Sequence, residues 1–287
     1  MVLKIEMDRV FELGKAFSVV KPYIPYIHVI DPQYWSIKRV IEVNSDTGVL
    51  LVVGNSIVSY RLMLRGEDYW NIFAEYANRF GEIDKYLDWF AEFLKKYNRI
   101  RFADKMSRVR KLYNSILFRN LSSKPYTYCD NLSEFNRILA NTLKSELSAK
   151  TIVFTTKMYY YACLASGTAT LMDFDIEFPV DRRNAALTVH TCMVKCTNSY
   201  LKCIDLLMSR YRNVVISVWK IVSKTSGIPP LIIDTFTWIL RGLLDRGVSH
   251  RDIVKNIKEK IPEIKSDSSL NSIFNLVVKL DRNKCRP

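Results

Sequence analysis

The sequence has few of the residues that mark disordered, fibrous or membrane-spanning chains. Only 9 of its 287 residues are glycine and 9 are proline, whereas 48% are hydrophobic. These counts exclude a collagen-like chain or a flexible linker, and the apolar content is sufficient for a packed core. No segment approaches the roughly 18 uninterrupted apolar residues that a membrane-spanning helix needs. The N-terminal segment has charges throughout and lacks the apolar stretch of a signal peptide. We therefore expect a soluble, intracellular protein.

Acidic residues are also scarce relative to basic ones. The chain has 43 lysine and arginine residues against 29 aspartate and glutamate residues, a formal net charge of +14. This excess favours a polyanionic partner, either a nucleic acid or the anionic face of a membrane. Ten basic residues but one acid, Asp104, lie in what we call the basic segment, residues 95–124. We expect its basic side chains to contact phosphates rather than form only a solvated helix face, and its aromatic rings to point into the core.

Closely spaced cysteine pairs are missing as well. The six cysteines, at positions 129, 163, 192, 196, 203 and 285, include no CxxC pair and no regular Cys/His pattern. Cys192, Cys196 and Cys203 are spaced four and seven residues apart, which predicts one helical face. We expect buried core thiols, with a metal site or a disulfide as the alternatives.

Apolar residues recur at three- and four-residue intervals along most of the chain, as in amphipathic helices. One strand-like stretch, residues 49–60, could form a β-hairpin around Gly54-Asn55. We favour a buried helix there, because its polar residues fit a helical face equally well. The fold class is therefore predicted to be all-α. Helices are expected over residues 67–80, 84–97, 131–143, 214–222, 232–244, 251–261 and 269–280, the third of them capped by Asn131 or Ser133.

The segment 141–162 contains a lysine whose position favours nucleophilic chemistry. One helix should end near Leu143 and a second should begin near Ser148, a good N-cap. Lys150 then falls in the first turn, where the helix dipole disfavours an ammonium and favours the free amine. A free amine attacks electrophilic carbon and forms a Schiff base. The same helical face carries three further side chains: Phe154, Lys157 and Tyr161.

A second candidate lies in the segment FDIEFPVDRR. Pro179 ends an extended stretch, and Asp181 is predicted to be the N-cap of the next helix. Taken alone, Asp181 would be an ordinary cap and Lys150 an ordinary surface lysine. Their combination is more informative than either residue.

A helix, a short hairpin, a helix bearing a lysine and then Pro-Val-Asp opening another helix together resemble the helix-hairpin-helix DNA glycosylase superfamily. The chain is more closely similar to the archaeal GO glycosylase branch, which excises 8-oxoguanine. The matching residues are AKTIVFTTKMYYYA (149–162), FPVDRR (178–183), GEDYW (66–70) and the Asp234/Trp238 pair. The resemblance covers about residues 30 to 260.

One detail points to the archaeal branch, and one departs from the wider superfamily. The interval from Lys150 to Asp181 is 181 − 150 = 31 residues, and such a long interval is typical of that branch. It identifies Lys150, rather than Lys157, as the nucleophile. The hairpin KSELSA lacks the Gly-rich turn that binds a phosphate in the wider superfamily, and the archaeal branch lacks it too. The residues that grip the phosphates are therefore not identified.

The resemblance implies a bifunctional DNA glycosylase and lyase of base-excision repair. Residues 1–287 would form one glycosylase unit of two helical lobes, with the hairpin motif at about 131–162 and the active site in the cleft between the lobes. Lys150 would attack the sugar C1′ and form a Schiff base, Asp181 would stabilise positive charge on the sugar, and β-elimination would nick the strand. The resemblance also implies DNA containing 8-oxoguanine as substrate, no metal or organic cofactor, no membrane partner and a monomer.

Base recognition in this family implies roles for six residues by motif position. Aromatic rings would clamp the flipped base and polar groups would read its edge. The residues are Gln33, Trp70, Phe154, Lys157, Asp234 and Trp238.

Other interpretations of the same residues remain. Gln33 would otherwise be a turn residue after Asp31-Pro32, and both tryptophans would be core residues. The alternatives for the whole chain are a non-catalytic basic helical protein that binds nucleic acid, and a helical scaffold whose charge serves only solubility.

Overall fold

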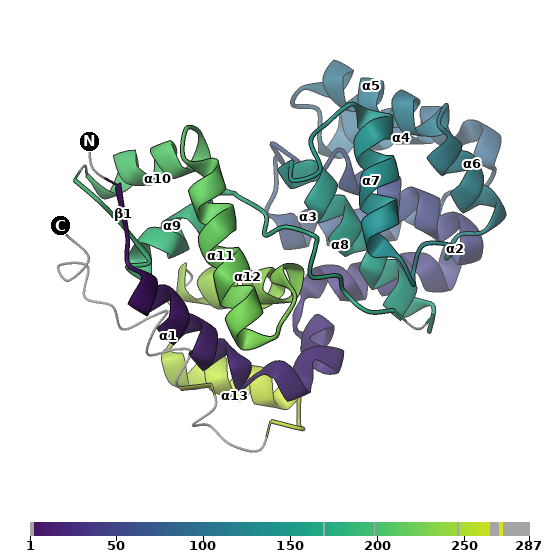
Figure 1. Ribbon diagram of the computed structural model, residues 1–287. Helices are drawn as coiled ribbons and strands as arrows, with labels where there is room; N and C mark the ends of the chain where they lie inside the picture. The colour runs from purple at the N-terminus through teal and green to yellow at the C-terminus, as the bar shows by residue number, and fades with distance from the viewer. Residues whose placement is uncertain (1–2, 169, 198, 246, 265–269, 272–287) are drawn as a thin grey trace. The chain divides into compact units, whose positions relative to one another are not determined.

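Helices make up most of the computed structural model, which describes residues 3–168, 170–197, 199–245, 247–264, 270 and 271 (Figure 1). The chain divides into two compact units. We call residues 31–173 the central unit and residues 1–30 with 174–287 the terminal unit. The expected all-α class is confirmed. The strands within the described ranges are β1 (Leu3–Ile5) and β2 (Val194–Cys196), which pair antiparallel and lie outside the stretch that looked strand-like in the sequence.

The central unit is built around a long helix, α2, that packs along α8 and against α3. α2 bends at Ser45, whose φ is +48°. Its second half is buried from Val49 to Ser56, so the expected buried helix in this stretch is confirmed and the β-hairpin is not formed. The helices are α2 (Pro32–Ser56), α3 (Gly66–Ala77), the 3-10 turn η2 (Ile83–Lys85), α4 (Tyr86–Tyr97), α5 (Phe102–Tyr113), α6 (Ile116–Ser123), α7 (Leu132–Leu143) and α8 (Lys150–Ala165).

Aromatic side chains from α3 and α4 fill the core of the central unit. Trp89 and Phe93 stack with ring centroids 5.8 Å apart, and Phe73 meets Phe93 edge-on at 5.4 Å. Trp70 packs edge-on against Phe73 at 5.5 Å. Such contacts add to the stabilisation from burying the rings, so α3 is held firmly in place.

The terminal unit joins the first thirty residues to the last third of the chain. α1 packs against α11, closely enough that a Cβ at Gly14 would lie 2.6 Å from the Cβ of Thr225. Phe17 meets Trp219 and Phe236 edge-on. The helices are α1 (Met7–Ser18), the 3-10 helix η1 (Lys21–Ile30), α9 (Arg182–His190), α10 (Tyr200–Met208), α11 (Arg212–Ser226), α12 (Pro230–Asp245) and α13 (His250–Lys260). The helix expected over 269–280 lies outside the described residues, except for positions 270 and 271.

The cysteines differ from the prediction of free core thiols. Cys129 is bonded to Cys163 in the central unit, and Cys196 to Cys203 in the terminal unit. The Cα atoms of these pairs lie 5.8 and 6.0 Å apart, within the range that a disulfide spans. The expected shared helical face is also wrong. Cys192 has a left-handed φ of +57° after α9, Cys196 lies in β2 and Cys203 lies in α10.

Candidate active site

Lys150 is the first residue of α8, and its side chain is exposed. The N-cap is Ala149, so the predicted cap, Ser148, is wrong by one residue. The consequence for Lys150 is small, because it stays in the first helical turn. Its amine lies exposed at the N-terminal end of α8, where it is accessible to an electrophilic carbon.

The hairpin before Lys150 is held by Asn136 on α7. The Asn136 side-chain amide donates to the Leu147 carbonyl at 3.3 Å. Its oxygen accepts a hydrogen bond from Thr156 Oγ1 at 2.8 Å. The start of α7 is capped by Asn131, one of the two predicted caps, which accepts from the Glu134 amide at 3.0 Å. Asn136 therefore ties the hairpin to α8 at Thr156, in the second turn after Lys150.

An aromatic pair follows Lys150 along α8. Phe154 is half-buried, and its ring lies 6.3 Å from the ring of Trp70 on α3. Trp70 is fully buried, and its Nε1 has no hydrogen-bond partner among the described residues. A buried indole N–H without a partner costs free energy. Trp70 is thus buried in the central unit and carries an unsatisfied donor.

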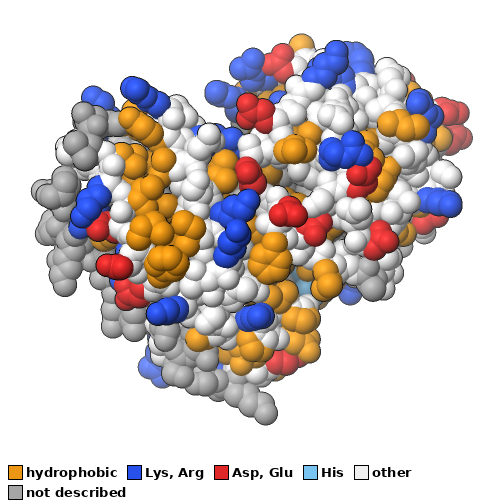
Figure 2. Space-filling view, in the orientation of Figure 1, with side chains coloured by type: hydrophobic (Ala, Val, Ile, Leu, Met, Phe, Trp, Pro, Cys, Tyr) orange, Lys and Arg blue, Asp and Glu red, His pale blue; other side chains and the backbone are white. Residues whose placement is uncertain are grey.

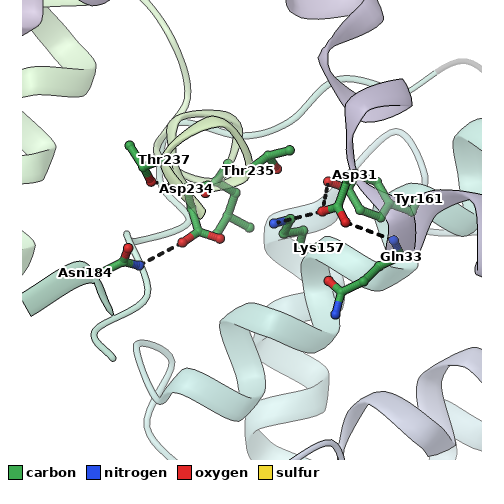
Figure 3. A network of polar contacts seen from close by, with 9 residues as sticks. Asp31, Gln33, Lys157, Tyr161, Asn184, Asp234, Thr235 and Thr237 are labelled. Atoms are coloured by element: carbon green, nitrogen blue, oxygen red, sulfur yellow. Dashed lines mark hydrogen bonds and ion pairs between the residues drawn. The ribbon is translucent and has the colours of Figure 1, made fainter. Parts of the chain in front are cut away.

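A buried cluster joins α8 to the start of α2 (Figure 3). Asp31 is the N-cap of α2, and its Oδ1 accepts a hydrogen bond from the backbone N–H of Gln33 at 2.9 Å. The other oxygen, Oδ2, accepts from the Tyr161 hydroxyl at 2.9 Å and lies 3.5 Å from Lys157 Nζ. Gln33 is buried in the first turn of α2, so it is helical and not a turn residue. The sequence pattern did not single out Asp31, since Asp-Pro signals only a helix start.

The terminal unit carries a second cluster, centred on Asn184. Asp181 caps α9 as predicted, and its Oδ1 accepts a hydrogen bond from the backbone N–H of Asn184 at 2.9 Å. The Asn184 side chain donates to the Pro179 carbonyl and to Asp234 Oδ1, both at 2.8 Å (Figure 3). Asn184 thus links the Pro-Val-Asp motif to α12. The sequence pattern did not single it out.

Trp238 lies one turn after Asp234 on α12 and is half-buried. The Arg183 guanidinium lies 5.0 Å from the centre of its ring, within cation–π distance. Asp234 and Trp238 therefore both contact the first turn of α9. Just before that turn, Phe178 stacks on Trp219 at 4.4 Å, which anchors the extended segment leading to Asp181.

The predicted site residues thus fall into two groups. The central unit contains Gln33, Trp70, Lys150, Phe154 and Lys157, and the terminal unit contains Asp181, Asp234 and Trp238. Within the described ranges, no group of three or more His, Cys, Asp or Glu side chains could hold a metal ion. The same ranges contain no helix long and apolar enough to cross a membrane.

The basic segment runs from the end of α4 through α5 and α6. Figure 2 shows blue side chains gathered at the top of the central unit, where Figure 1 places α5. Two members differ from the rest, since Arg108 is half-buried and Lys105 is fully buried. The exposed members are Lys95, Lys96, Arg99, Arg101, Arg110, Lys111, Arg119 and Lys124. Most basic side chains of the segment are thus exposed to solvent.

A family model and the related proteins carry the same description. Residues 14–271 match the family model AGOG, described as N-glycosylase/DNA lyase. An N-glycosylase/DNA lyase of Nanoarchaeum equitans is 30% identical over 235 residues, covering 80% of this chain and 89% of that protein. A protein of the same description from Pyrobaculum aerophilum is 29% identical over 214 residues, covering 73% of this chain and 76% of that protein.

One solved structure shows the same fold. It is the 8-oxoguanine DNA glycosylase from Pyrobaculum aerophilum in complex with 8-oxoguanosine. The TM-score is 0.69 at 24% sequence identity, over 83% of this chain and 89% of that one. The likeness extends the all-α assignment to a known helical architecture.

Proposed function

The chain belongs to the AGOG family of N-glycosylases/DNA lyases, and from this premise we propose that it excises 8-oxoguanine from DNA and then cuts the strand. The solved structure of the same fold holds 8-oxoguanosine, which supports this base as the substrate. The protein would act as a monomer on DNA inside the cell. No bound metal or organic cofactor enters the chemistry.

The first chemical step is a displacement at the sugar. The Lys150 amine attacks C1′, the bond from C1′ to the base breaks, and the base leaves with the electron pair and takes up a proton. The attacking nitrogen gives up a proton, and opening of the C1′–O4′ bond then gives a protonated imine between Lys150 and the sugar, with O4′ taking up a proton from solvent to become a hydroxyl. Loss of a proton from C2′ breaks the C3′–O3′ bond by β-elimination, which nicks the strand. Water finally releases Lys150.

Asp181 is assigned to the charge that develops on the sugar during this displacement. An ionised carboxylate stabilises a cationic transition state by electrostatic attraction. Its hydrogen bond from the Asn184 amide fixes the carboxylate at the start of α9. Asp181 also accepts protons around the attack.

Recognition of the flipped base is assigned to the remaining predicted residues. Ring stacking would come from the aromatic side chains, and hydrogen bonds to the base edge from the polar ones. The aromatic set is Trp70, Phe154 and Trp238, and the polar set is Gln33, Lys157 and Asp234.

One observation carries the proposal. A lysine opens the second helix of a hairpin, and 31 residues later an aspartate caps the next helix. Both features occur in a chain whose family is defined by glycosylase and lyase activity. The alternative of a non-catalytic nucleic-acid-binding protein gives neither residue a chemical role.

The test uses two duplexes that differ only in one base, 8-oxoguanine or guanine. Wild-type protein should release the damaged base and nick only the first duplex. Lys150→Gln should abolish both steps. Lys144→Gln is the matched control, because it removes the same charge from the same hairpin, and it should retain excision at saturating enzyme. Equal inactivity of wild type on both duplexes would refute the proposed substrate.

A further inference from the structure

Asp31 accepts hydrogen bonds from two helices at the start of α2. An N-cap needs one side-chain oxygen, and Asp31 Oδ1 fills this role for the Gln33 amide. The second oxygen is not needed by the cap. Asp31 Oδ2 accepts a hydrogen bond from the Tyr161 hydroxyl at 2.9 Å and lies 3.5 Å from the Lys157 ammonium nitrogen (Figure 3). The carboxylate therefore serves α8 as well as α2.

Burial makes this arrangement unusual. Asp31 is 0% exposed and the Lys157 side chain is 4% exposed. Other ion pairs in the central unit, such as Arg101–Asp104 and Arg137–Glu134, are formed at the surface. Removing two charges from water is costly, and stability alone rarely accounts for a buried pair. A buried ion pair beside candidate base-contacting residues points to a role in recognition.

The neighbours of the pair restrict its geometry. The Tyr161 ring packs edge-on against Tyr34 on α2, with centroids 5.8 Å apart, so its hydroxyl is held toward Asp31. The Lys157 ammonium lies 5.7 Å from the centre of the same Tyr161 ring. Lys157 is thus positioned by a carboxylate and an aromatic face.

We propose that Asp31 is a positioning residue for base recognition, which keeps Lys157 charged and oriented as a hydrogen-bond donor to a purine edge. The proposal rests on the function proposed above. An ammonium has three N–H donors, so a contact with Asp31 is compatible with a second contact to an acceptor such as O6 of a guanine-type base. Without the carboxylate, a buried lysine favours the neutral amine, which is a weaker donor.

Asp31→Asn is a suitable test because it removes the negative charge beside Lys157 and keeps the N-cap of α2. Asparagine caps helices as well as aspartate does, and its oxygen still accepts from Gln33. Tyr161→Phe is the matched control, since it removes one donor to the same carboxylate and leaves the Asp31–Lys157 charges intact. The readouts are single-turnover excision of 8-oxoguanine and cleavage of a duplex with a preformed abasic site, which has no base to read.

The expected result is selective. Asp31→Asn should slow excision at least about tenfold more than it slows abasic-site cleavage, the scale expected for losing a charged hydrogen bond. Tyr161→Phe should show a smaller difference between the two rates. In a double-mutant cycle, Asp31→Asn should add little to Lys157→Met, because both remove the same interaction.

Three results would overturn the proposed role of Asp31 or the proposed substrate. Equal loss of both activities in Asp31→Asn would reduce Asp31 to a structural cap and overturn the proposal. Additive effects of Asp31→Asn and Lys157→Met would overturn it as well, because Asp31 would then act independently of Lys157. A wild-type protein that cleaves abasic sites but does not excise 8-oxoguanine would overturn the proposed substrate, and with it this inference.

Discussion

Lys105 should make the folded state more stable as the pH rises above about 8. Its side chain is fully buried at the start of α5, and burial lowers its pKa to about 8. Nζ donates to the Asn98 carbonyl at 3.2 Å and to the Asn98 side-chain oxygen at 2.5 Å. The Asn98 side-chain amide in turn donates to the carbonyl of Val58, two residues after α2, and to the Tyr69 hydroxyl on α3. This network therefore supports the helix that carries Trp70.

The direction of this change in stability with pH follows from how many protons Lys105 binds in the folded and in the unfolded state. Below pH 8 the lysine is protonated in both states, and the folded state carries the full cost of burying the charge. Between about pH 8 and 10.4 the folded state has lost the proton and the unfolded chain still binds it, so stability rises with pH. For folded and unfolded pKa values of about 8 and 10.4, the free energy of unfolding gains about 2 kcal/mol between pH 7 and 9.5.

Urea unfolding of wild type and Lys105→Met at these two pH values measures the effect. Methionine has a similar length and does not titrate, so the gain should be absent in the variant. Ionisation of tyrosines affects both proteins alike and cancels in the difference. Lys111→Met, on the exposed face of the same helix, should behave as wild type. An equal gain in wild type and Lys105→Met would refute the reasoning.

Three further changes test other parts of the structure. Asn184→Ala leaves two buried acceptors without their donor, so we expect a loss of about 1–3 kcal/mol in unfolding free energy and slower excision of 8-oxoguanine. Replacing Cys129 and Cys163 by serine opens a link between residues 34 apart in sequence, which should cost about 3–4 kcal/mol in urea unfolding. Neutralising Arg110 and Lys111 on α5 should weaken DNA binding and reduce the slope of log K against log salt by up to about 2.

Each of these changes has a control. Asn184→Asp keeps the size of the side chain but opposes Asp234 with a like charge, so it should be at least as damaging as alanine. Under reducing conditions the cysteine double variant and wild type should be equally stable, because the reductant opens Cys129–Cys163 in wild type and Cys196–Cys203 in both proteins. Lys220→Gln/Lys224→Gln on α11 removes the same two charges from exposed positions of the terminal unit. An equal loss of salt dependence in that variant would show that net charge, rather than the basic segment, determines binding.

Local signals predicted several helices and their first residues well. Asn131 caps α7, Lys150 opens α8 and Asp181 caps α9, because caps and apolar periodicity depend on residues within a few positions. The one-residue error at Ser148 is of the size expected for helix ends. The all-α class followed from the same signals.

Long-range partners were not predictable in this way. Asp31 and Tyr161 are 130 residues apart and Asn184 and Asp234 are 50 apart, so no local pattern indicates their contacts. The disulfides were missed for a related reason. The regular spacing of Cys192, Cys196 and Cys203 suggested one helix, but α9 ends before the first of them and a strand carries the second.

Covalent trapping tests the central claim, that Lys150 is the nucleophile, most directly. Wild-type protein is incubated with an 8-oxoguanine duplex and borohydride, and the reduced adduct is digested and mapped by mass spectrometry. The account predicts one modified peptide, with the sugar attached to Lys150, and no adduct in Lys150→Gln. An adduct on Lys157 or another lysine, or an undiminished adduct in Lys150→Gln, would contradict it.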